Sequence, residues 1–221
     1  MKIEVNNIVK QYTRGGRHIV ILKGVSLSVS SGEFISVTGR SGSGKSTLVN
    51  IIAGLTKPTS GNILWDGKDI FSFSDKEMSL YRNAAIGCAP QGHSALSSLT
   101  VLENVRLPFH FSPREGNSAE KANELLKQFQ IEPLADSLPK SLSGGELKRM
   151  AIARAMINKP SFLLVDEPTG DLDTQTTHVI MKIFRKAADE GMAVLMITHD
   201  KDTVEYADKN FIMESGTLTQ G

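Results

Sequence analysis

A glycine-rich segment of this chain has the residue types and spacing of a phosphate-binding loop. Residues 39–47 read GRSGSGKST, and they follow an apolar run and precede a helical one. In such a loop, glycines let backbone N–H groups surround phosphate oxygens at a helix N-terminus, while a lysine adds positive charge and a serine hydroxyl can bind Mg²⁺. A glycine-rich turn without a ligand is the ordinary alternative, and the complete match in this context disfavours it. The predicted binding residues are Gly39, Arg40, Ser41, Gly42, Ser43, Gly44, Lys45, Ser46 and Thr47.

Two adjacent carboxylates follow a second apolar run. Asp166 and Glu167 come directly after residues 162–165, and ligands of open α/β sheets gather at the carboxyl ends of strands. We expect Asp166 to orient the Mg²⁺ shell and Glu167 to polarise an attacking water. An acidic pair after a strand is often only a solvated strand end. The phosphate-binding loop in the same chain makes the catalytic interpretation stronger.

A third segment predicts a capped helix with an unusual first turn. Ser143 and Glu146 have the spacing of a capping box, and apolar residues follow them at helical intervals. A well-capped helix is the simple interpretation. Two glycines in the first turn, however, each cost roughly 1 kcal/mol of helix propensity relative to alanine. Close approach to an anion would explain them, so we interpret this helix N-terminus as a second phosphate-facing site.

The elements that must position these residues follow from the apolar pattern. Residues 34–38, 162–165 and 193–197 have no polar face, as expected of strands covered on both sides. Between them lie segments with helical spacing, such as residues 179–187, which Gly191 can terminate. Alternating strands and helices of this kind predict an α/β core with a parallel sheet.

The N-terminal part reads instead as an antiparallel β layer. Val25, Leu27 and Val29 alternate with serines, and Gly15-Gly16 can turn the hairpin before them. Residues 62–70 read as a second hairpin with an Asp-Gly turn. We expect both hairpins to belong to one layer.

The middle of the chain reads mostly helical. We predict a helix over residues 119–130 and another that begins near Ser143. Residues from about 92 to 158 are therefore expected to form a helical subdomain inserted in the core. With no linker or repeat visible, residues 1–221 are expected to form a single domain.

Composition limits the possible classes of protein. The 221 residues include 25 basic and 24 acidic side chains, so no strong net charge draws the chain to DNA or to an anionic membrane. We therefore expect no nucleic-acid partner. The single cysteine, Cys88, cannot form an internal disulfide and points to a reducing compartment. No signal peptide is visible, and no apolar stretch approaches the roughly 20 residues that cross a bilayer. We expect a cytoplasmic chain, and any membrane role must come through a partner.

Taken together, these motifs resemble the ATP-hydrolysing subunit of an ATP-binding-cassette (ABC) transporter. Residues 142–146 read LSGGE and match that family's signature motif. They lie after the phosphate-binding loop and shortly before the acidic pair, and this order is more specific than any single motif. The resemblance extends from Tyr12 to His199 and implies an α/β P-loop NTPase core with a parallel sheet, an N-terminal antiparallel β layer and an inserted helical subdomain.

The resemblance also implies roles for residues outside the three motifs. Tyr12 matches the aromatic residue that stacks on adenine, although it could be an ordinary strand-end tyrosine. Gln91 falls where the family has a glutamine that reaches Mg²⁺ and the attacking water. His199 matches the histidine that contacts the γ-phosphate. Asp173 matches an aspartate of the D-loop that lies across the dimer interface.

In this family, ATP lies between the phosphate-binding loop of one subunit and the signature segment of the other. The resemblance thus implies a homodimer that ATP closes, with Mg²⁺ as the second cofactor. The trans contacts would come from Leu142, Ser143, Gly144, Gly145 and Glu146. It also implies a membrane permease as partner and a peripheral location on the inner face of the cell membrane.

Two positions depart from the family pattern. Leu147 stands where a glutamine often follows LSGGE, and Asp171 stands where the most similar subfamily usually has asparagine. Neither departure changes a residue to which we assign a chemical role. Residues 93–111 combine apolar side chains with serine and proline, and we predict that part of this segment docks a permease helix while the rest fills the core.

Within the family, the chain most resembles the subfamily that serves lipoprotein release, macrolide export, antimicrobial-peptide resistance and cell division. This resemblance rests on its short length and on residues 99–108 and 168–173. We therefore expect a subunit that powers export or mechanical transmission through a separate permease. A division-type regulatory ATPase that drives a membrane partner without transport is an alternative. A DNA-repair ABC ATPase is disfavoured, because the chain has no heptad insertion, no zinc cysteines and no basic excess.

Overall fold

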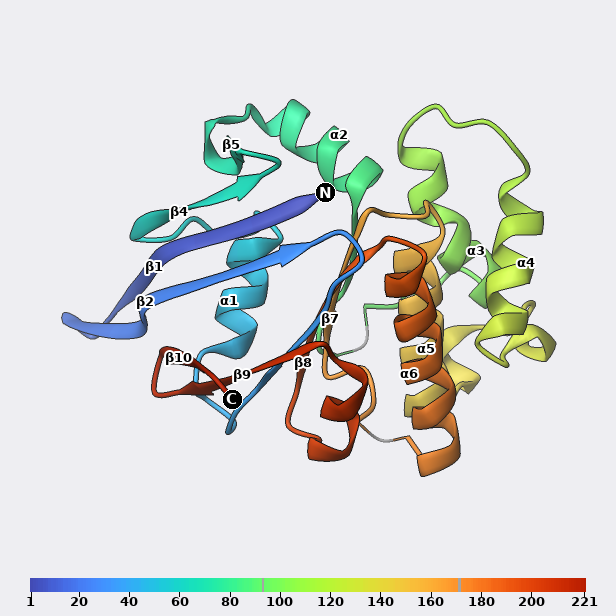
Figure 1. Ribbon diagram of the computed structural model, residues 1–221. Coiled ribbons are helices and arrows are strands. Elements are labelled where there is room, and N and C mark those ends of the chain that lie inside the picture. Colours follow the sequence, from blue (N-terminus) through green and yellow to red (C-terminus); the bar gives the residue numbers. More distant parts are fainter. Residues whose placement is uncertain (93, 171) are drawn as a thin grey trace.

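The computed structural model describes residues 1–92, 94–170 and 172–221 (Figure 1). The strands are β1 (Lys2–Arg14), β2 (Arg17–Ser30), β3 (Phe34–Thr38), β4 (Ser60–Trp65), β5 (Lys68–Asp69), β6 (Ile86–Ala89), β7 (Phe162–Asp166), β8 (Ala193–Thr198), β9 (Lys209–Glu214) and β10 (Thr217–Gln220). The α-helices are α1 (Lys45–Ile52), α2 (Asp75–Ala85), α3 (Val101–Arg106), α4 (Ser118–Gln128), α5 (Gly144–Met156) and α6 (Thr174–Asp189). Short 3-10 segments are η1 (Ile70–Ser72), η2 (Leu107–Phe111), η3 (Glu132–Leu134), η4 (Pro139–Ser141) and η5 (Lys201–Tyr206). His93, the first residue of the expected docking segment, and Asp171 lie outside the described residues.

The strands form two sheets of different kinds. A six-stranded sheet has the order β10-β9-β3-β8-β7-β6, and its strands are parallel except for the C-terminal hairpin β9–β10. A four-stranded antiparallel sheet has the order β2-β1-β4-β5. The predicted α/β core with a parallel sheet and an N-terminal antiparallel layer is therefore confirmed.

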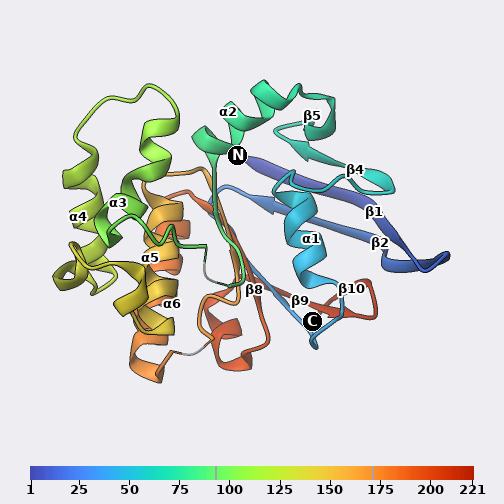
Figure 2. The same ribbon diagram turned by 180° about the vertical axis from the view of Figure 1, so that it is seen from behind.

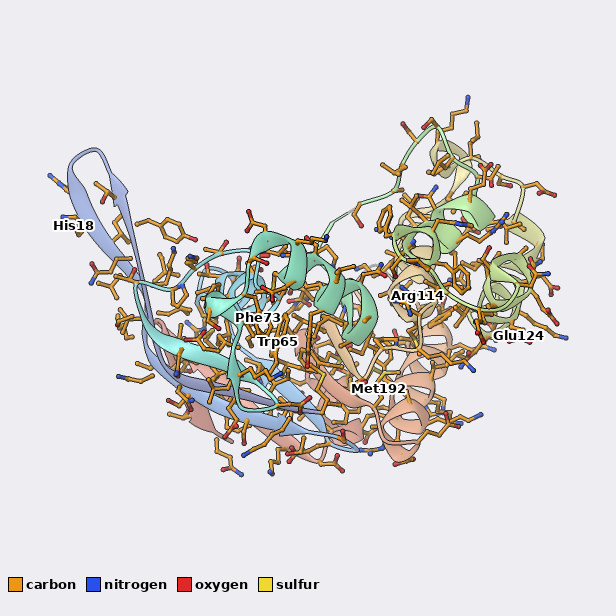
Figure 3. All side chains as sticks on the ribbon, turned by 90° about the horizontal axis from the view of Figure 1, so that it is seen from above. His18, Trp65, Phe73, Arg114, Glu124 and Met192 are labelled. Atoms are coloured by element: carbon orange, nitrogen blue, oxygen red, sulfur yellow. The ribbon has the colours of Figure 1, made fainter. Side chains whose placement is uncertain are left out.

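The two hairpins of the antiparallel layer turn at the expected glycines. Gly15 and Gly16 join β1 to β2, and Asp66 and Gly67 join β4 to β5, all with positive φ. Two successive positive φ values match the right-handed twist of hairpin strands. Figure 3 shows the tip of the first hairpin, marked by His18, projecting away from the body of the molecule, with Arg114 and Glu124 at the opposite end.

The parallel strands lack a polar face because apolar clusters cover both sides of their sheet. On β8, the side chains of Ala193, Leu195 and Ile197 enter the cluster shared with α1 and the antiparallel sheet. Val194 and Met196 enter the cluster shared with helices α3 to α6. Figures 1 and 2 show these layers, with α1 beside β1 and β2, α2 near β4 and β5, and α3 to α6 on the other side of the parallel sheet.

The helices that surround the site have clear local causes. Capping boxes start α3 at Thr100 and α5 at Ser143, the second of which we predict from the sequence. The expected helix over residues 119–130 is α4, which ends two residues earlier at Gln128; Gln130 has φ +56 and cannot continue a right-handed helix. Ala89 is extended in β6, as expected from the proline that follows it. The subdomain boundaries at residues 92 and 158 stay a prediction.

The start of β3, which leads to the phosphate-binding loop, is fixed by a carboxylate from the C-terminal part of the chain. Asp208 Oδ2 accepts a 2.7 Å hydrogen bond from the Phe34 N–H and lies 3.0 Å from Arg185 Nη1. Burial opposes the charge of Asp208, but the hydrogen bond from Phe34 and the Arg185 guanidinium outweigh it, so the pKa of Asp208 lies below its usual value. The carboxylate thus stabilises the fold in its charged form.

We predict that Asp208→Asn destabilises the protein at pH 7 by about 0.5 to 1 kcal/mol, a value discounted because the carboxylate is half exposed. Since the folded pKa is lowered, the charge contributes fully above the unfolded pKa of Asp and is lost as pH falls through the folded pKa. Urea unfolding of both proteins at a series of pH values checks this. The difference should shrink below about pH 4, and a difference that stays constant into acid would contradict it.

Candidate ATP site

A cavity of about 600 Å³ opens at the carboxyl ends of the parallel strands. Segments that are far apart in the chain meet there: the loop after β3, the residue pair at the end of β7, and single residues after β6 and β8. The residues that line it are Ile21, Ser41, Gly42, Gly44, Lys45, Ser46, Thr47, Gln91, Asp166, Glu167 and His199. The structure therefore brings most of the predicted phosphate-binding and catalytic residues into one cavity.

Two glycines of the loop, Gly39 and Gly44, lie where neighbouring atoms leave no room for a side chain. A Cβ on Gly39 would lie 2.3 Å from the Met213 carbonyl oxygen, and one on Gly44 would lie 2.9 Å from Leu22 Cδ2. Gly44 also has φ +111, which side chains rarely adopt. Larger residues at either position would push the loop out of place.

The loop leads directly into α1, which begins at Lys45. The Lys45 side chain folds back over the loop, and its Nζ donates hydrogen bonds to the carbonyl oxygens of Gly39 at 2.7 Å and Arg40 at 3.0 Å. In this position the Lys45 residue is only 8% exposed. A positive charge and the N-terminus of a helix thus face the same cavity.

Asp166 is a buried carboxylate with spare hydrogen-bonding capacity. It is 5% exposed, and its Oδ1 has no hydrogen-bond partner within the described part of the chain. Burial and the neighbouring Glu167 raise the pKa of Asp166, while the Ser46 hydroxyl, Lys45 and Lys148 act in the opposite direction. An unpaired buried carboxylate oxygen is costly unless a cation or donor joins it.

Glu167 and His199 form a direct pair. His199 Nδ1 lies 2.8 Å from Glu167 Oε2, and the His199 N–H donates to the same oxygen at 3.3 Å. The glutamate side chain is 10% exposed, whereas the histidine side chain is 69% exposed. The backbone of Glu167 has φ +54, an uncommon value for a non-glycine residue, and its N–H donates to the Ile197 carbonyl at 2.8 Å. The strained backbone places this carboxylate at the cavity wall.

The signature segment lies elsewhere. Of the described residues that line the cavity, none belongs to residues 142–146. Ser143 caps α5: its N–H and Oγ donate to Glu146 Oε2 at 2.7 and 2.8 Å, and the Glu146 N–H donates back to Ser143 Oγ at 3.3 Å. The hydrogen bonds from the Ser143 backbone and hydroxyl lower the pKa of Glu146. Lys148, in the same helix, donates to the Gly170 carbonyl at 2.6 Å and ties α5 to the segment after Glu167.

Several other predicted site residues also lie outside this cavity. Tyr12 is on β1 and 45% exposed, with Lys10 Nζ 4.9 Å from the centre of its ring. Asp173 caps α6 by accepting bonds from the Thr176 N–H and hydroxyl, which lower its pKa. Arg40 and Ser43 line a neighbouring hollow on the other side of the loop.

The structure adds two contributors that sequence reasoning missed. Ile21 of β2 lines the cavity, and the β9–β10 turn lies against the loop through Met213 and Gly216. Both come from elements that pair with the site only through long-range packing. No local motif marks them, so sequence spacing could not have found them.

The chain is similar to known proteins in both sequence and structure. Residues 22–170 match the family model described as ABC transporter. The chain is 41% identical to the uncharacterized ABC transporter ATP-binding protein YvrO of Bacillus subtilis, over 98% of this chain and 95% of that protein. It is also 41% identical to the lipoprotein-releasing system ATP-binding protein LolD of Aquifex aeolicus, over 95% and 93%.

A longer relative is the macrolide export ATP-binding/permease protein MacB of Chlorobaculum tepidum, at 38% identity over 98% of this chain. The chain spans 33% of the length of that protein. Among the described residues, no helix combines the length and the apolar character that crossing a membrane requires.

Solved structures agree with the sequence comparisons. The dimeric structure of MJ0796, a bacterial ABC transporter cassette, superposes with a TM-score of 0.94 at 38% identity, covering 98% of this chain and 96% of that one. A post-hydrolysis state of the same cassette, bound to ADP and Pi, gives 0.95 at 37% identity, covering 99% and 97%. The chain therefore belongs to the ABC transporter family, as an ATP-binding subunit that hydrolyses ATP.

Proposed function

We propose that the cavity at the ends of β3, β6, β7 and β8 is the ATP site and that residues 39–47 hold the phosphates there. The observation that carries this proposal is the convergence of the loop, Gln91, the acidic pair and His199 on one cavity. Backbone N–H groups of the loop and the N-terminus of α1 bind phosphate oxygens, and Lys45 adds a point charge. Tyr12 stacks on the adenine ring from β1.

The same cavity fits Mg²⁺. Ser46 offers a hydroxyl, Gln91 an amide oxygen and Asp166 a buried carboxylate whose Oδ1 is unpartnered within the described chain. Mg²⁺ prefers such oxygen ligands and is often held by one or two protein groups together with substrate phosphates. In the portion of the chain that the structure describes, no three acidic, histidine or cysteine side chains cluster as a metal site, which is consistent with shared ligation. When bound, the ion neutralises phosphate charge.

Glu167 and His199 provide the side chains that activate the attacking water. The buried Glu167 carboxylate accepts a proton from the attacking water as general base. His199, paired with Glu167 at 2.8 Å, orients that carboxylate and reaches the γ-phosphate with its other ring nitrogen. Gln91 holds the water in line.

We further propose that each ATP site is completed by a second copy of the chain. The signature residues Leu142 to Glu146 do not line the cavity of their own subunit, while the capped N-terminus of α5 presents a helix dipole for an anion. A head-to-tail homodimer would place this terminus against the γ-phosphate, with Asp173 at the interface. The dimeric state of the MJ0796 cassette supports this arrangement.

A permease is the proposed membrane partner, and a groove of about 420 Å³ is the proposed docking site. Its walls come from α2 and β6 on one side and from η2 and α5 on the other. Phe111 is 64% exposed and Leu55 is 58% exposed at its edges. Arg82 and Arg154 give it basic groups, so we infer an amphipathic permease helix that carries an acidic side chain. Docking there would hold the chain at the inner face of the cell membrane.

Only part of the predicted docking segment, residues 93–111, contributes to this groove. Of its apolar residues, Val101 and Phe109 fill the core, Leu99, Leu102 and Leu107 are half-buried, and Leu96 is exposed. Asn104, fully buried, accepts from the Leu96 N–H and donates to its carbonyl, so the loop after Gln91 is held in one shape. Residues 92–158 would then act as a subdomain that couples Gln91 to the permease.

The relatives named for lipoprotein release and macrolide export support a role in export. We propose this class of transport for the chain, within a single ATPase domain of residues 1–221. A division-type partner would use the same ATPase cycle. A near-neutral net charge of +1 gives no support to a nucleic-acid role.

We predict that Glu167→Gln retains MgATP binding and lowers the hydrolysis rate by about 10² to 10⁴, because the general base is lost. The variant should also accumulate as an ATP-bound dimer. In contrast, Lys45→Ala should weaken nucleotide binding itself. Phosphate release assays measure hydrolysis, equilibrium binding measures nucleotide affinity, and size-exclusion chromatography with ATP detects the dimer. Together these measurements distinguish the two variants. Normal hydrolysis by Glu167→Gln would show that the base has been misassigned.

We predict that Ser143→Phe abolishes cooperative hydrolysis without weakening ATP binding by the monomer, because the signature helix acts on the partner subunit's nucleotide. Titration with a fluorescent nucleotide measures binding, and the dependence of hydrolysis on protein concentration measures dimer activity. Ser141→Phe is the control, since this exposed residue lies just before the signature segment. Undiminished hydrolysis by Ser143→Phe would rule out the shared site.

We predict that Phe111→Glu prevents recovery of the chain with membrane permeases and leaves MgATP binding unchanged, because a charge at the groove edge repels an acidic, apolar helix. Leu80→Glu is the matched control: Leu80 is 49% exposed but does not line the groove. Affinity purification from native membranes measures recovery. Equal recovery of both variants would exclude the groove as the docking site.

A further inference from the structure

The C-terminal hairpin β9–β10 lies against the phosphate-binding loop, although the two are at opposite ends of the chain. Figures 1 and 2 show this hairpin beside the N-terminal end of α1. The Gly216 N–H donates to the Ser43 carbonyl of the loop at 3.1 Å, and the Gly216 carbonyl accepts from the Lys23 N–H of β2 at 2.8 Å. A single turn residue therefore bridges the loop and the antiparallel layer.

The turn packs so closely against β2 that only glycine fits at position 216. Gly216 is buried, has φ +86, and would place a Cβ 2.3 Å from the Ile21 carbonyl oxygen. At the other end of the loop, Gly39 has a matching restriction, since its Cβ would lie 2.3 Å from the Met213 carbonyl oxygen. The hairpin thus holds the loop at its first residue and near its end.

This contact constrains the orientation of the next peptide N–H group along the loop, that of Gly44. In a trans peptide the C=O and the following N–H point in opposite directions within one rigid plane. Because the Ser43 carbonyl is held toward the hairpin, the Gly44 N–H is turned away from it. Gly44 lines the 600 Å³ cavity, so the contact constrains an N–H group that belongs to a residue at the proposed phosphate site.

We propose that the β9–β10 turn is a positioning element of the phosphate-binding loop and that Gly216 is its key positioning residue. The inference rests on the proposal that this loop binds the nucleotide phosphates. Gly216 acts through Ser43 and Gly44 and does not itself contact the nucleotide. Coupling between two sites is reciprocal: if the docked hairpin favours phosphate binding, bound nucleotide must hold the hairpin docked.

The test compares Gly216→Ala with Gly67→Ala in the full chain. Gly67 has a similar φ of +79 in the β4–β5 turn, but a Cβ there meets nothing within 4 Å. Both variants carry backbone strain, and only Gly216→Ala disturbs the loop. With MgADP as probe, which avoids hydrolysis, Gly216→Ala should raise the Kd about tenfold, within the usual range of coupling between sites. Gly67→Ala should leave the Kd unchanged at a temperature where both are folded.

Lys45→Ala separates failure of this inference from failure of the proposed site. If Lys45→Ala binds MgADP weakly and both glycine variants bind like the unmodified chain, the hairpin does not position the loop. If Lys45→Ala binds MgADP normally, the proposed phosphate site itself is wrong, and the inference falls with it.

A second measurement on the unmodified chain does not depend on the folding of any variant. MgADP should slow hydrogen exchange at the Gly216 and Lys23 amides, whose N–H groups donate the two bridging hydrogen bonds. Exchange in the β4–β5 turn should stay unchanged. Protection confined to the loop residues 39–47 would overturn the inference.

Discussion

The arrangement of the site depends on the order of four neighbouring parallel strands. β3, β8, β7 and β6 lie side by side in register, and their carboxyl ends all meet the same edge of the sheet. Each strand delivers one part of the cavity: the loop after β3, His199 after β8, the acidic pair at the end of β7 and Gln91 after β6. Because the strands are covered on both faces by apolar side chains, this order is fixed by the core and not by the polar residues themselves.

The rigidity of this core lets the site hold conformations that would be unfavourable in isolation. Glu167 keeps a positive φ at the end of a strand whose five residues are all buried, and Asp166 keeps an unpaired carboxylate oxygen among the described residues. Such local costs of about 1 to 3 kcal/mol persist only where surrounding packing determines the backbone. The site is therefore stabilised from the sheet below it, and its polar groups remain available to a ligand.

Sequence alone predicted the parts whose signals are local. The phosphate-binding loop, the buried strands, the hairpin turns at Gly15-Gly16 and Asp66-Gly67 and the cap at Ser143 depend on neighbours a few residues away, so periodicity and turn chemistry reveal them. The proposed docking groove and the proposed role of Gly216 could not be predicted, since they arise where α2 meets η2 and where the last hairpin meets the first loop. The helix α2 and the pair β9–β10 also escaped prediction, because their apolar residues are few and packed from one side.

The resting position of Lys45 has a consequence for which anions the loop can select. Its ammonium group already donates to two carbonyl oxygens of its own loop, so an incoming anion competes with these oxygens for the ammonium hydrogens. A small anion that reaches only the ammonium gains little from that exchange. A polyphosphate gains more, because it also engages the backbone N–H groups along the loop. If the loop holds the nucleotide phosphates as proposed, this arrangement of Lys45 favours a chain of linked phosphates over small free anions.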